Sequence, residues 1–511
     1  MKSTALEFET TANMPVVLTI AGSDSAGMAG IQQDIRTLSR MDVHPVCAIT
    51  ANTAQNNQGV AAIHPVAVEV VTSQIEAITS LSPSAIKIGL LGHINHIVPV
   101  CSAIRKLNKP VIYDPVFAAS SGSHFANNDF IAACKTHLLP RCHLITPNLN
   151  EAEALVGFAL KTPHDIEKAA HLILSMGAHA VMIKGGHQTH VTNNPSNLCS
   201  DYFCDAQQRF WLSNQRLPTQ HSRGTGCALS STIAGAMARG YELYDAIVIG
   251  KMAIQHGLRH AKAVAGQQGS VHIQHFPNHP DDLPLLTKNW PQHWLHTSFP
   301  PCTHPINTHP IEEEKITLGI YPVVDSAQWI ERLIKLGIHT IQLRVKQLQG
   351  DDLDNEIKKS ITVAKKYNVR LFINDHWQLA IKHKAYGVHL GQEDLDQADT
   401  TAIRNAGLRL GISTHSFYET ARAHALYPSY IAIGPVFATT SKNMPWIPRG
   451  LEGLTYWQQV LTSYPLVAIG GINYTRAQAI RDLGIGGIAM ISAITQAEDP
   501  DTVTKNLLTL F

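Results

Sequence analysis

Short apolar runs alternate with longer segments of helical period along most of the chain. In the N-terminal half the short runs are rich in Val and Ile, which is typical of buried β-strands. The predicted strands of this half are residues 16–21, 85–89, 111–114, 143–146 and 180–184. Because Ala- and Leu-rich segments of helical period separate them, the pattern predicts an α/β domain with a largely parallel central sheet.

The alternation becomes stricter in the C-terminal half. Apolar runs there predict eight strands, at residues 317–324, 340–345, 370–373, 387–390, 410–413, 430–433, 466–469 and 487–490. Helical stretches separate them, for instance residues 351–367, 416–426 and 475–483. Eight β/α units in roughly 200 residues match the small end of the (β/α)8 TIM barrel, so this is the predicted fold of the C-terminal half.

Proline interrupts every periodic pattern between the two halves. We predict a linker at residues 276–314, between domains at residues 1–275 and 315–511. A length of 511 residues, too large for one hydrophobic core, also favours at least two domains. The linker is rich in His, but its irregular spacing and the lack of a Cys or carboxylate pattern argue against a metal site. Its aromatic residues indicate that parts of it pack on a domain.

Composition narrows the classes of partner. Lys and Arg number 40 against 39 Asp and Glu, so there is no excess of positive charge to hold a nucleic acid or an anionic membrane. No apolar stretch approaches the roughly 20 residues that cross a bilayer, and the start of the chain does not resemble a signal peptide. The eight Cys have no regular spacing, which favours a reducing compartment. We expect a cytoplasmic protein with small-molecule partners.

Two glycine-containing segments of the N-terminal half indicate phosphate chemistry. Residues 223–227, Arg-Gly-Thr-Gly-Cys, open a run of small residues that predicts a tightly packed helix. Backbone N–H groups at such a helix start point at an anion and stabilise a phosphoryl group in transfer. Residues 21–34 form the second segment, a strand end, a glycine-rich turn and a helix start. A glycine turn before a buried helix explains either segment alone, so further motifs have to decide.

Those motifs stand at residues 49–56, 114–116, 146–151 and 184–187. Together with the two glycine segments, their order and spacing resemble the hydroxymethylpyrimidine and hydroxymethylpyrimidine-phosphate kinases, which have a ribokinase-like α/β fold. The resemblance covers residues 14 to 275 approximately. It implies phosphorylation at the expense of ATP.

The resemblance also implies a role for each matching residue. Those that hold the pyrimidine are Gly22, Asp34 and Gln55. Those that form the anion hole are Gly224, Thr225 and Gly226, and those on the metal and nucleotide side are Asp114, Asn148, Glu151 and Lys184. Cys227 stands where ribokinase relatives usually have an aspartate base, and a helix N-terminus is expected to lower the pKa of its thiol. Strand-end polar residues that only cap loops are the competing interpretation of the nucleotide set.

The sequence departs from the family pattern at two places. Ala26 and Met28 stand where the family loop has more glycine, and Arg223 stands where a His often precedes the Gly-Thr-Gly-Cys segment. We expect Met28 to narrow the ring pocket and Arg223 to add a phosphate contact. Neither change touches the proposed chemistry directly.

The predicted barrel strands end in polar residues, and in a barrel the catalytic groups gather at these C-terminal strand ends. Asp375 and Asp394 follow neighbouring strands, with Arg344 and Lys346 at the end of another. Carboxylate oxygens suit Mg²⁺ and cations suit pyrophosphate oxygens. Gly-Gly at residues 470–471 and the end of the last predicted strand match the phosphate cradle that barrels build from their last two loops.

The segments 342–346, 373–375, 388–394 and 434–442 are similar to thiamine-phosphate synthase, from about residue 315 to the end. By that resemblance Asp375 and Asp394 bind Mg²⁺, and Ser413 lies beside the pyrimidine. The other substrate-binding residues implied are Gln342, Arg344, Lys346, Asn374, Thr439, Ser441 and Lys442 for the pyrimidine pyrophosphate, and Gly471, Ile491 and Ser492 for the thiazole phosphate. The family reaction displaces pyrophosphate from hydroxymethylpyrimidine pyrophosphate, and the thiazole nitrogen captures the pyrimidine cation.

The two resemblances fit each other, because the product of the kinase is the substrate of the synthase. One alternative joins a pyridoxal-type kinase to a thiazole tautomerase-like barrel, which does not need the pair Asp375 and Asp394. Another is a precursor-binding regulatory protein with degenerate sites, against which the intact Cys227, Lys184 and Arg344 argue. Relatives of the kinase commonly form dimers, so a homodimer through the N-terminal domain is expected.

Overall fold

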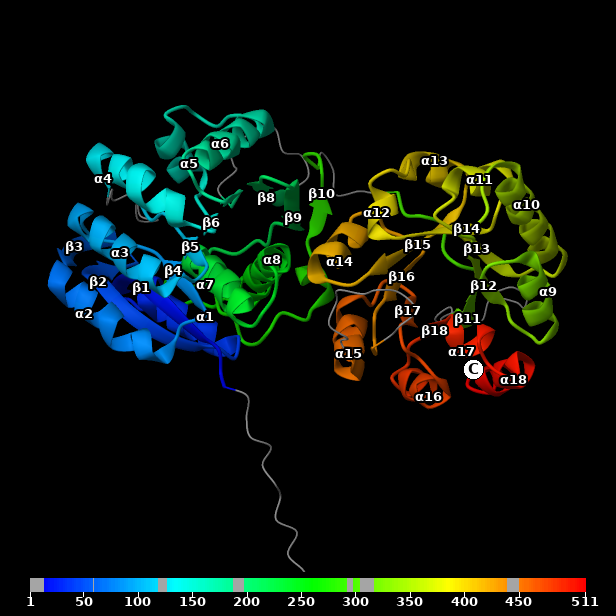
Figure 1. Cartoon of the computed structure of the whole chain (residues 1–511). Helices are drawn as coiled ribbons and strands as arrows, with labels where there is room; N and C mark the ends of the chain where they lie inside the picture. Colours follow the sequence, from blue (N-terminus) through cyan, green and yellow to red (C-terminus); the bar gives the residue numbers. More distant parts are fainter. Residues whose placement is uncertain are drawn as a thin grey trace, which may run out of the picture. The chain divides into compact units, whose positions relative to one another are not determined.

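The computed structural model describes residues 13–57, 59–117, 126–186, 197–291, 297–303, 317–438 and 450–511. The chain divides into two compact units (Figure 1). The N-terminal unit contains residues 1–277 and 281–294, and the C-terminal unit contains residues 278–280 and 295–511.

A ten-stranded sheet forms the centre of the N-terminal unit, in the order β10-β9-β8-β7-β6-β5-β4-β1-β2-β3. Its strands are β1 (Val16–Asp24), β2 (His44–Asn56), β3 (Gly59–Pro65), β4 (Ala85–Ile88), β5 (Val111–Tyr113), β6 (Leu144–Ile145), β7 (Ala180–Ile183), β8 (Leu198–Asp205), β9 (Arg209–Gln215) and β10 (Leu285–Thr287). The strands from β2 to β7 in this order pair in parallel, whereas β3, β8, β9 and β10 are antiparallel. The five predicted strands are confirmed as β1 and β4–β7, and the ribokinase-like fold is confirmed with them.

Helices cover the sheet (Figure 1). They are α1 (Gly30–Arg40), α2 (Val68–Ile78), α3 (Ile97–Leu107), α4 (Asn128–Ala133), α5 (Leu149–Val156), α6 (Pro163–Ser175), α7 (Thr225–Ala238) and α8 (Leu243–Arg259). Helices α2, α3, α5 and α6 contribute to one hydrophobic cluster with the sheet. Helix α7 packs against α1, α8 and the central strands, and its residues 228–236 are all buried. Because most of these side chains are small, α7 lies close to the sheet.

The C-terminal unit is a closed barrel of eight parallel strands in sequential order (Figure 1). The strands are β11 (Gly319–Val324), β12 (Thr340–Leu343), β13 (Arg370–Asn374), β14 (Gly387–Leu390), β15 (Arg409–Thr414), β16 (Tyr430–Ile433), β17 (Leu466–Ile469) and β18 (Gly487–Met490). The helices are α9 (Ala327–Lys335), α10 (Gly350–Lys366), α11 (Trp377–Lys382), α12 (Gln392–Leu395), α13 (Thr400–Asn405), α14 (Phe417–His424), α15 (Gly450–Val460), α16 (Tyr474–Asp482), α17 (Ser492–Thr495) and α18 (Pro500–Leu508). All eight predicted strands are confirmed, and with them the TIM barrel.

The described parts of the predicted linker belong to the two units. Strand β10 extends the N-terminal sheet. Asp282, just before this strand, is buried and forms an ion pair with Arg259 of α8 at 3.0 Å. In the C-terminal unit Phe299 bonds through its backbone to Tyr427, and the buried Cys302 joins the barrel core. Proline-rich sequence therefore contributes here to both cores as well as connecting them.

No helix in the described ranges is long and apolar enough to cross a membrane. All eight cysteines are free. The described residues also contain no group of three or more His, Cys, Asp and Glu side chains placed to hold a metal ion.

Candidate functional sites

The glycine-rich loop after β1 is organised by its own carboxylate. Both oxygens of Asp24 accept backbone N–H groups, from Ala26 at 2.8 Å, Met28 at 2.9 Å and Ala29 at 2.8 Å. Gly224, which precedes α7, has a φ of 74°, and a Cβ there would lie 2.2 Å from the carbonyl oxygen of Met28. The loop and the start of α7 therefore touch through backbone atoms, which only glycine permits at residue 224.

The first turn of α7 faces a charged cluster. Gly224 is the N-cap residue, and no side chain caps the helix. A Cβ on Gly226 would lie 3.0 Å from Oδ2 of Asp114 and 3.2 Å from Nζ of Lys184. The structure therefore brings the predicted anion hole and the predicted nucleotide side together, although the sequence separates them widely. Uncapped N–H groups beside a lysine form a suitable site for phosphate oxygens.

Asp114, Glu151 and Lys184 form this cluster. Nζ of Lys184 lies 2.5 Å from Oδ1 of Asp114 and 4.0 Å from Oε2 of Glu151. Burial raises the pKa of Glu151 to about 7, and Lys184 opposes the rise while Asp114 adds to it. Glu151 and Asn148 also form a reciprocal capping box at the start of α5, with N–H to oxygen distances of 2.9 and 2.7 Å. Asn148 therefore caps α5, and Glu151 both caps the helix and faces the lysine.

Cys227 differs from the expectation based on its position. Burial raises the pKa of its thiol to about 11, and Lys87 opposes this rise while Asp34 and Asp114 add to it. The prediction that the helix start lowers this pKa is therefore wrong for the protein alone, because desolvation and two neighbouring carboxylates outweigh it. The residue is only partly covered and follows the anion hole directly, so it keeps its place in the site.

Asp34 is fully buried, and several protein groups surround its carboxylate. Its carboxylate accepts hydrogen bonds from Thr19 at 2.6 Å and Ser231 at 2.8 Å, and pairs with Lys87 at 2.8 Å. These partners lie on β1, α7 and β4. Lys87 was not predicted as a site residue, although a single Lys within the apolar strand at residues 85–89 was an available signal.

Replacing Asp34 by Asn is expected to destabilise the N-terminal unit by about 3–5 kcal/mol, because Lys87 would remain buried without a countercharge. Chemical unfolding measures this in the transition of the N-terminal unit, and the barrel's transition is the internal control. The double variant Asp34→Asn, Lys87→Met should recover much of the loss. Additive losses in the double variant would contradict the pairing.

The other predicted ring-binding residues, Gly22 and Gln55, lie on β1 and β2. A Cβ on Gly22 would lie 2.9 Å from Leu90, so the backbone packs closely there. The backbone of Gln55 exchanges hydrogen bonds with the Ser25 hydroxyl, at 2.8 and 2.9 Å. Arg223 donates to the carbonyl oxygen of Asn56 at 2.9 Å. Arg223 therefore ties the segment before α7 to the end of β2, and the expected phosphate contact stays a prediction.

In the barrel, Asp375 and Asp394 meet at the C-terminal strand ends. Asp375 has a φ of 65°, which is unusual for a residue other than glycine and marks local strain. Burial raises its pKa to about 6, and the charge of Asp394 and a hydrogen bond to it add to the rise, whereas Arg344 and Asn374 lower it. Two carboxylates close enough to share a proton are hard oxygen ligands whose repulsion a divalent cation would relieve. The pair therefore fits Mg²⁺.

The predicted pyrophosphate residues are only partly within the described ranges. Arg344 is half-buried and acts on the pKa of Asp375 and His389, whereas Lys346 is exposed and Asn374 is buried. Three further predicted residues lie outside the described residues, namely Thr439, Ser441 and Lys442.

Ser413 ends a hydrogen-bonded chain that the sequence analysis did not identify. Oγ of Ser413 lies 2.8 Å from Nε2 of His389, whose Nδ1 lies 2.7 Å from the Tyr430 hydroxyl. The Tyr430 hydroxyl lies 2.8 Å from that of Tyr321. Burial lowers the pKa of His389 to about 3, and Arg344 contributes, so the imidazole is neutral. Gln342 hydrogen-bonds Tyr321 at the far end.

The loop after β17 packs closely against the segment that follows β16. Gly470 and Gly471 have φ values of 104° and 61°, and a Cβ on Gly471 would lie 2.3 Å from the carbonyl oxygen of Ala438. Ile491 and Ser492 follow β18 and are half-buried. The glycine pair thus lets these two segments touch through backbone atoms, and the predicted phosphate cradle stays a prediction.

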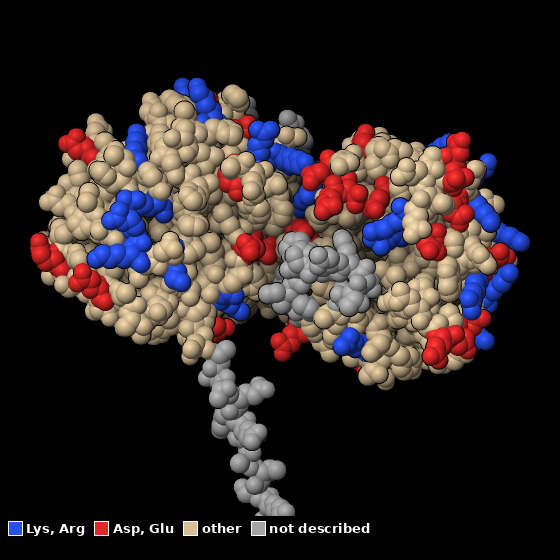
Figure 2. Space-filling model, viewed as in Figure 1, with Lys and Arg blue, Asp and Glu red and all other residues tan. Residues whose placement is uncertain are grey.

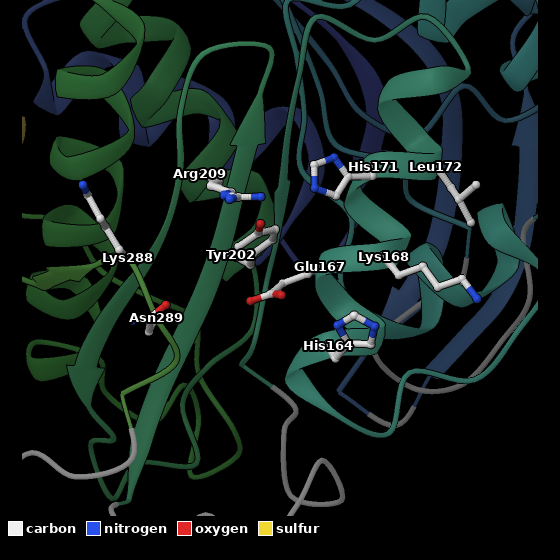
Figure 3. Close-up of a pocket in the computed structure, with 9 residues that line it drawn as sticks. All are labelled: His164, Glu167, Lys168, His171, Leu172, Tyr202, Arg209, Lys288 and Asn289. Carbon is white, nitrogen blue, oxygen red and sulfur yellow. The ribbon is translucent and has the colours of Figure 1, made fainter.

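A separate hollow of about 560 Å³ lies between α6 and strands β8–β10 (Figure 3). None of the predicted site residues lines it; its walls are His164, Glu167, Lys168, His171, Leu172, Tyr202, Arg209, Lys288 and Asn289.

On the face shown in Figure 2, basic and acidic side chains are interspersed. That face therefore presents no broad surface of one charge.

Comparisons with known proteins divide the chain in the same way. Residues 24–272 match the family model for phosphomethylpyrimidine kinase, and residues 320–494 match that for thiamine monophosphate synthase. The thiamine-phosphate synthase of Proteus mirabilis is 55% identical over 193 residues, which are 38% of this chain and 90% of the relative. That of Serratia proteamaculans is 53% identical over 203 residues, 40% of this chain and 96% of the relative.

Solved structures similar to the N-terminal unit include two kinases. The pyridoxal kinase of Staphylococcus aureus with ADP is 27% identical, with a TM-score of 0.48, over 52% of this chain and 94% of that one. The phosphomethylpyrimidine kinase of Clostridium difficile 630 is 31% identical, with a TM-score of 0.41, over 47% of this chain and 98% of that one.

Proposed function

Because the chain belongs to the phosphomethylpyrimidine kinase family in its N-terminal unit and to the thiamine-phosphate synthase family in its C-terminal unit, we propose that each of the two clusters described above is an active site. The chain is a bifunctional enzyme of thiamine biosynthesis. The kinase uses ATP to phosphorylate 4-amino-5-hydroxymethyl-2-methylpyrimidine and its phosphate to the pyrophosphate. The synthase joins that pyrophosphate to 4-methyl-5-(2-phosphoethyl)thiazole, which yields thiamine phosphate and free pyrophosphate.

The observation that carries the kinase assignment is the approach of Gly226 to both Asp114 and Lys184. The uncapped N–H groups of α7 and the Lys184 ammonium bind the phosphoryl group in transfer and the ATP phosphates, where fixed donors need no reorganisation. Asp114 and Glu151 would hold Mg²⁺, since their crowded carboxylates fit a divalent cation. Cys227 accepts the proton of the pyrimidine hydroxyl or phosphate.

The pyrimidine of the kinase reaction would lie on the loop after β1, against Gly22 and the carboxamide of Gln55. A carboxamide offers both a donor and an acceptor to an aminopyrimidine edge. Asp34 is the third residue predicted to hold the ring, and its pairing with Lys87 and its hydrogen bonds from Thr19 and Ser231 fix its carboxylate in place.

In the synthase, Asp375 and Asp394 would hold Mg²⁺. The ion neutralises charge on the leaving pyrophosphate when bound. Arg344, Lys346 and Asn374 bind the pyrophosphate oxygens, with the predicted Thr439, Ser441 and Lys442 from the loop after β16. Ser413 and Gln342 contact the pyrimidine, and the backbone at Gly471, Ile491 and Ser492 binds the thiazole phosphate. The bond from the pyrimidine methylene to oxygen breaks, and the thiazole nitrogen forms the new bond to that carbon.

The test supplies purified protein with hydroxymethylpyrimidine, Mg·ATP and thiazole phosphate, and measures thiamine phosphate by thiochrome fluorescence. With hydroxymethylpyrimidine as the substrate, we expect thiamine phosphate to form only when ATP is present. With the pyrimidine pyrophosphate as the substrate, we expect it to form without ATP. Binding of the pyrimidine without product under either condition would contradict the proposal and favour a regulatory binding protein.

We expect the affinity of the synthase site for Mg²⁺ to fall about tenfold for each pH unit below about 6. The raised pKa of Asp375 means that its carboxylate is protonated below that pH, and Mg²⁺ must displace the proton. Calorimetric titration of the chain with Mg²⁺ at pH 5 and pH 7.5, without substrates, measures this. Asp375→Asn is the matched control, because it should bind weakly at both pH values. Equal affinity of the wild type at both would contradict the assignment.

A cytoplasmic location and a homodimer complete the proposal. The eight free cysteines support a reducing compartment, and the resemblance to dimeric kinases supports association through the N-terminal unit. Light scattering of the full chain tests the second point.

A further inference from the structure

The interior of the barrel contains a polar chain where a TIM barrel usually packs branched aliphatic side chains. Tyr321 on β11, Tyr430 on β16 and His389 on β14 are 1%, 0% and 7% exposed. Tyr430 lies so close to β15 that a Cβ on Gly411 would come within 2.1 Å of its ring. Buried polar groups need partners, and here each finds one in the next member of the chain.

The chain ends at two side chains that are predicted to bind the synthase substrate. Oγ of Ser413 is one end, and the carboxamide of Gln342 is the other, through its hydrogen bond to Tyr321. The backbone carbonyl of Ser413 is held in addition by Nε2 of Gln392 at 2.7 Å. The Ser413 hydroxyl is thereby connected to the carboxamide of Gln342, on β12, through His389, Tyr430 and Tyr321.

Proton counting restricts such a chain. A neutral imidazole has one donor and one acceptor, and each hydroxyl carries one proton, so the hydrogen bonds between links run in a single direction. If His389 donates to Ser413, then Tyr430 donates to His389 and Tyr321 to Tyr430. Tyr321 then accepts an N–H from Gln342, and the Ser413 proton points outward. If the chain reverses, Ser413 donates inward and offers only a lone pair outward.

We propose that His389, with Tyr430 and Tyr321 behind it, is a positioning residue that orients the Ser413 hydroxyl and couples it to Gln342, so that the two groups recognise the aminopyrimidine edge together. A substrate with an N–H donor beside a ring acceptor selects one direction of the chain. The inference rests on the proposed synthase function and on the contact of Ser413 with the pyrimidine.

Two substitutions at His389 separate its two hydrogen bonds. The carboxamide of Asn reaches the depth of Nδ1 and so can keep the bond to Tyr430, whereas that of Gln reaches the depth of Nε2 and can keep the bond to Ser413. With pyrimidine pyrophosphate and thiazole phosphate as substrates, we expect kcat/KM to fall about 10- to 100-fold in His389→Asn and clearly less in His389→Gln. Equal losses, or a greater loss in His389→Gln, would overturn the proposal.

A double-mutant cycle tests whether His389 acts through Ser413. Ser413→Ala should lower kcat/KM by a similar factor, and the double variant with His389→Asn should be at most about twofold worse than Ser413→Ala alone. A merely structural role of His389 predicts that the two factors multiply, which would overturn the proposal.

Tyr430→Phe keeps the ring packing and removes only the hydroxyl. It therefore tests the coupling even if the His389 variants unfold. We expect about a tenfold loss of kcat/KM, measured well below the temperature at which this variant unfolds, and no further loss when Ser413→Ala is added. Multiplying losses would contradict the coupling. Formation of thiamine phosphate by the wild type tests the synthase function separately, so failure of the coupling and failure of the function are distinguishable.

Discussion

Asp375→Asn is expected to slow the synthase reaction by about 10²–10⁴-fold, because the substitution removes half of the carboxylate pair that would hold the metal ion against pyrophosphate. Asn is the informative replacement. It has the size of Asp and accepts the left-handed backbone conformation, φ 65°, which alanine would resist. The measurement is the rate of thiamine phosphate formation from pyrimidine pyrophosphate and thiazole phosphate.

The same variant should be at least as stable as the wild type. Since the folded-state pKa of Asp375 is raised to about 6, folding becomes less favourable as the pH rises from about 4 to 6, where the unfolded carboxyl ionises first. Asn removes this penalty. We expect the free energy of unfolding of the barrel to rise by about 1 kcal/mol at pH 7, with partial exposure of the site taken into account, and the difference to vanish below about pH 4.

Asp354→Asn is the matched control for Asp375→Asn. Asp354 is a carboxylate on α10 that pairs with Lys382 at 2.8 Å and is not among the predicted site residues. Its loss should leave the synthase rate unchanged. A rate in Asp375→Asn within about threefold of the wild type would contradict the metal assignment, and lost activity together with lost stability would indicate a structural role instead.

Cys227→Ala is expected to lower the kinase rate by about 10²–10⁴-fold, the usual contribution of a positioned general base. The synthase rate with pyrimidine pyrophosphate should not change, since Cys227 belongs to the N-terminal unit. Because the pKa of Cys227 is raised to about 11, the wild-type kinase rate should increase with pH across the alkaline range as the thiolate fraction grows. This increase should be absent in the variant.

Two variants control the interpretation of Cys227→Ala. Cys227→Ser should not restore activity, because a serine hydroxyl ionises far above a thiol. Cys47→Ala removes a half-buried thiol on β2 and should leave the rate unchanged. A Cys227→Ala enzyme with the wild-type pH profile would show that the proton goes to another group.

Local patterns predicted the barrel well. Four of its strands, β14, β16, β17 and β18, have the bounds that the apolar runs indicated. Each strand of such a barrel is buried on both faces, so that continuous Val- and Ile-rich runs carry the signal. The antiparallel strands β8 and β9 were missed because polar residues interrupt them. Asp201 on β8 is buried by a pair with Lys251 at 2.7 Å, a partner that no local pattern reveals.

The sequence alone determined the two folds, the chemistry of the two families and the residue types at each site, because strand and helix periods and glycine turns are properties of neighbouring residues. Only the tertiary structure decided what those residues do. Asp34 has its partners 53 and 197 residues away, so its burial and its pairing with Lys87 could not be predicted from neighbouring residues. The pKa of Cys227 and the chain from Ser413 to Tyr321 depend likewise on burial and on groups from different strands. Desolvation and hydrogen-bond partners are set by distance in space, and the order of residues along the chain does not specify that distance.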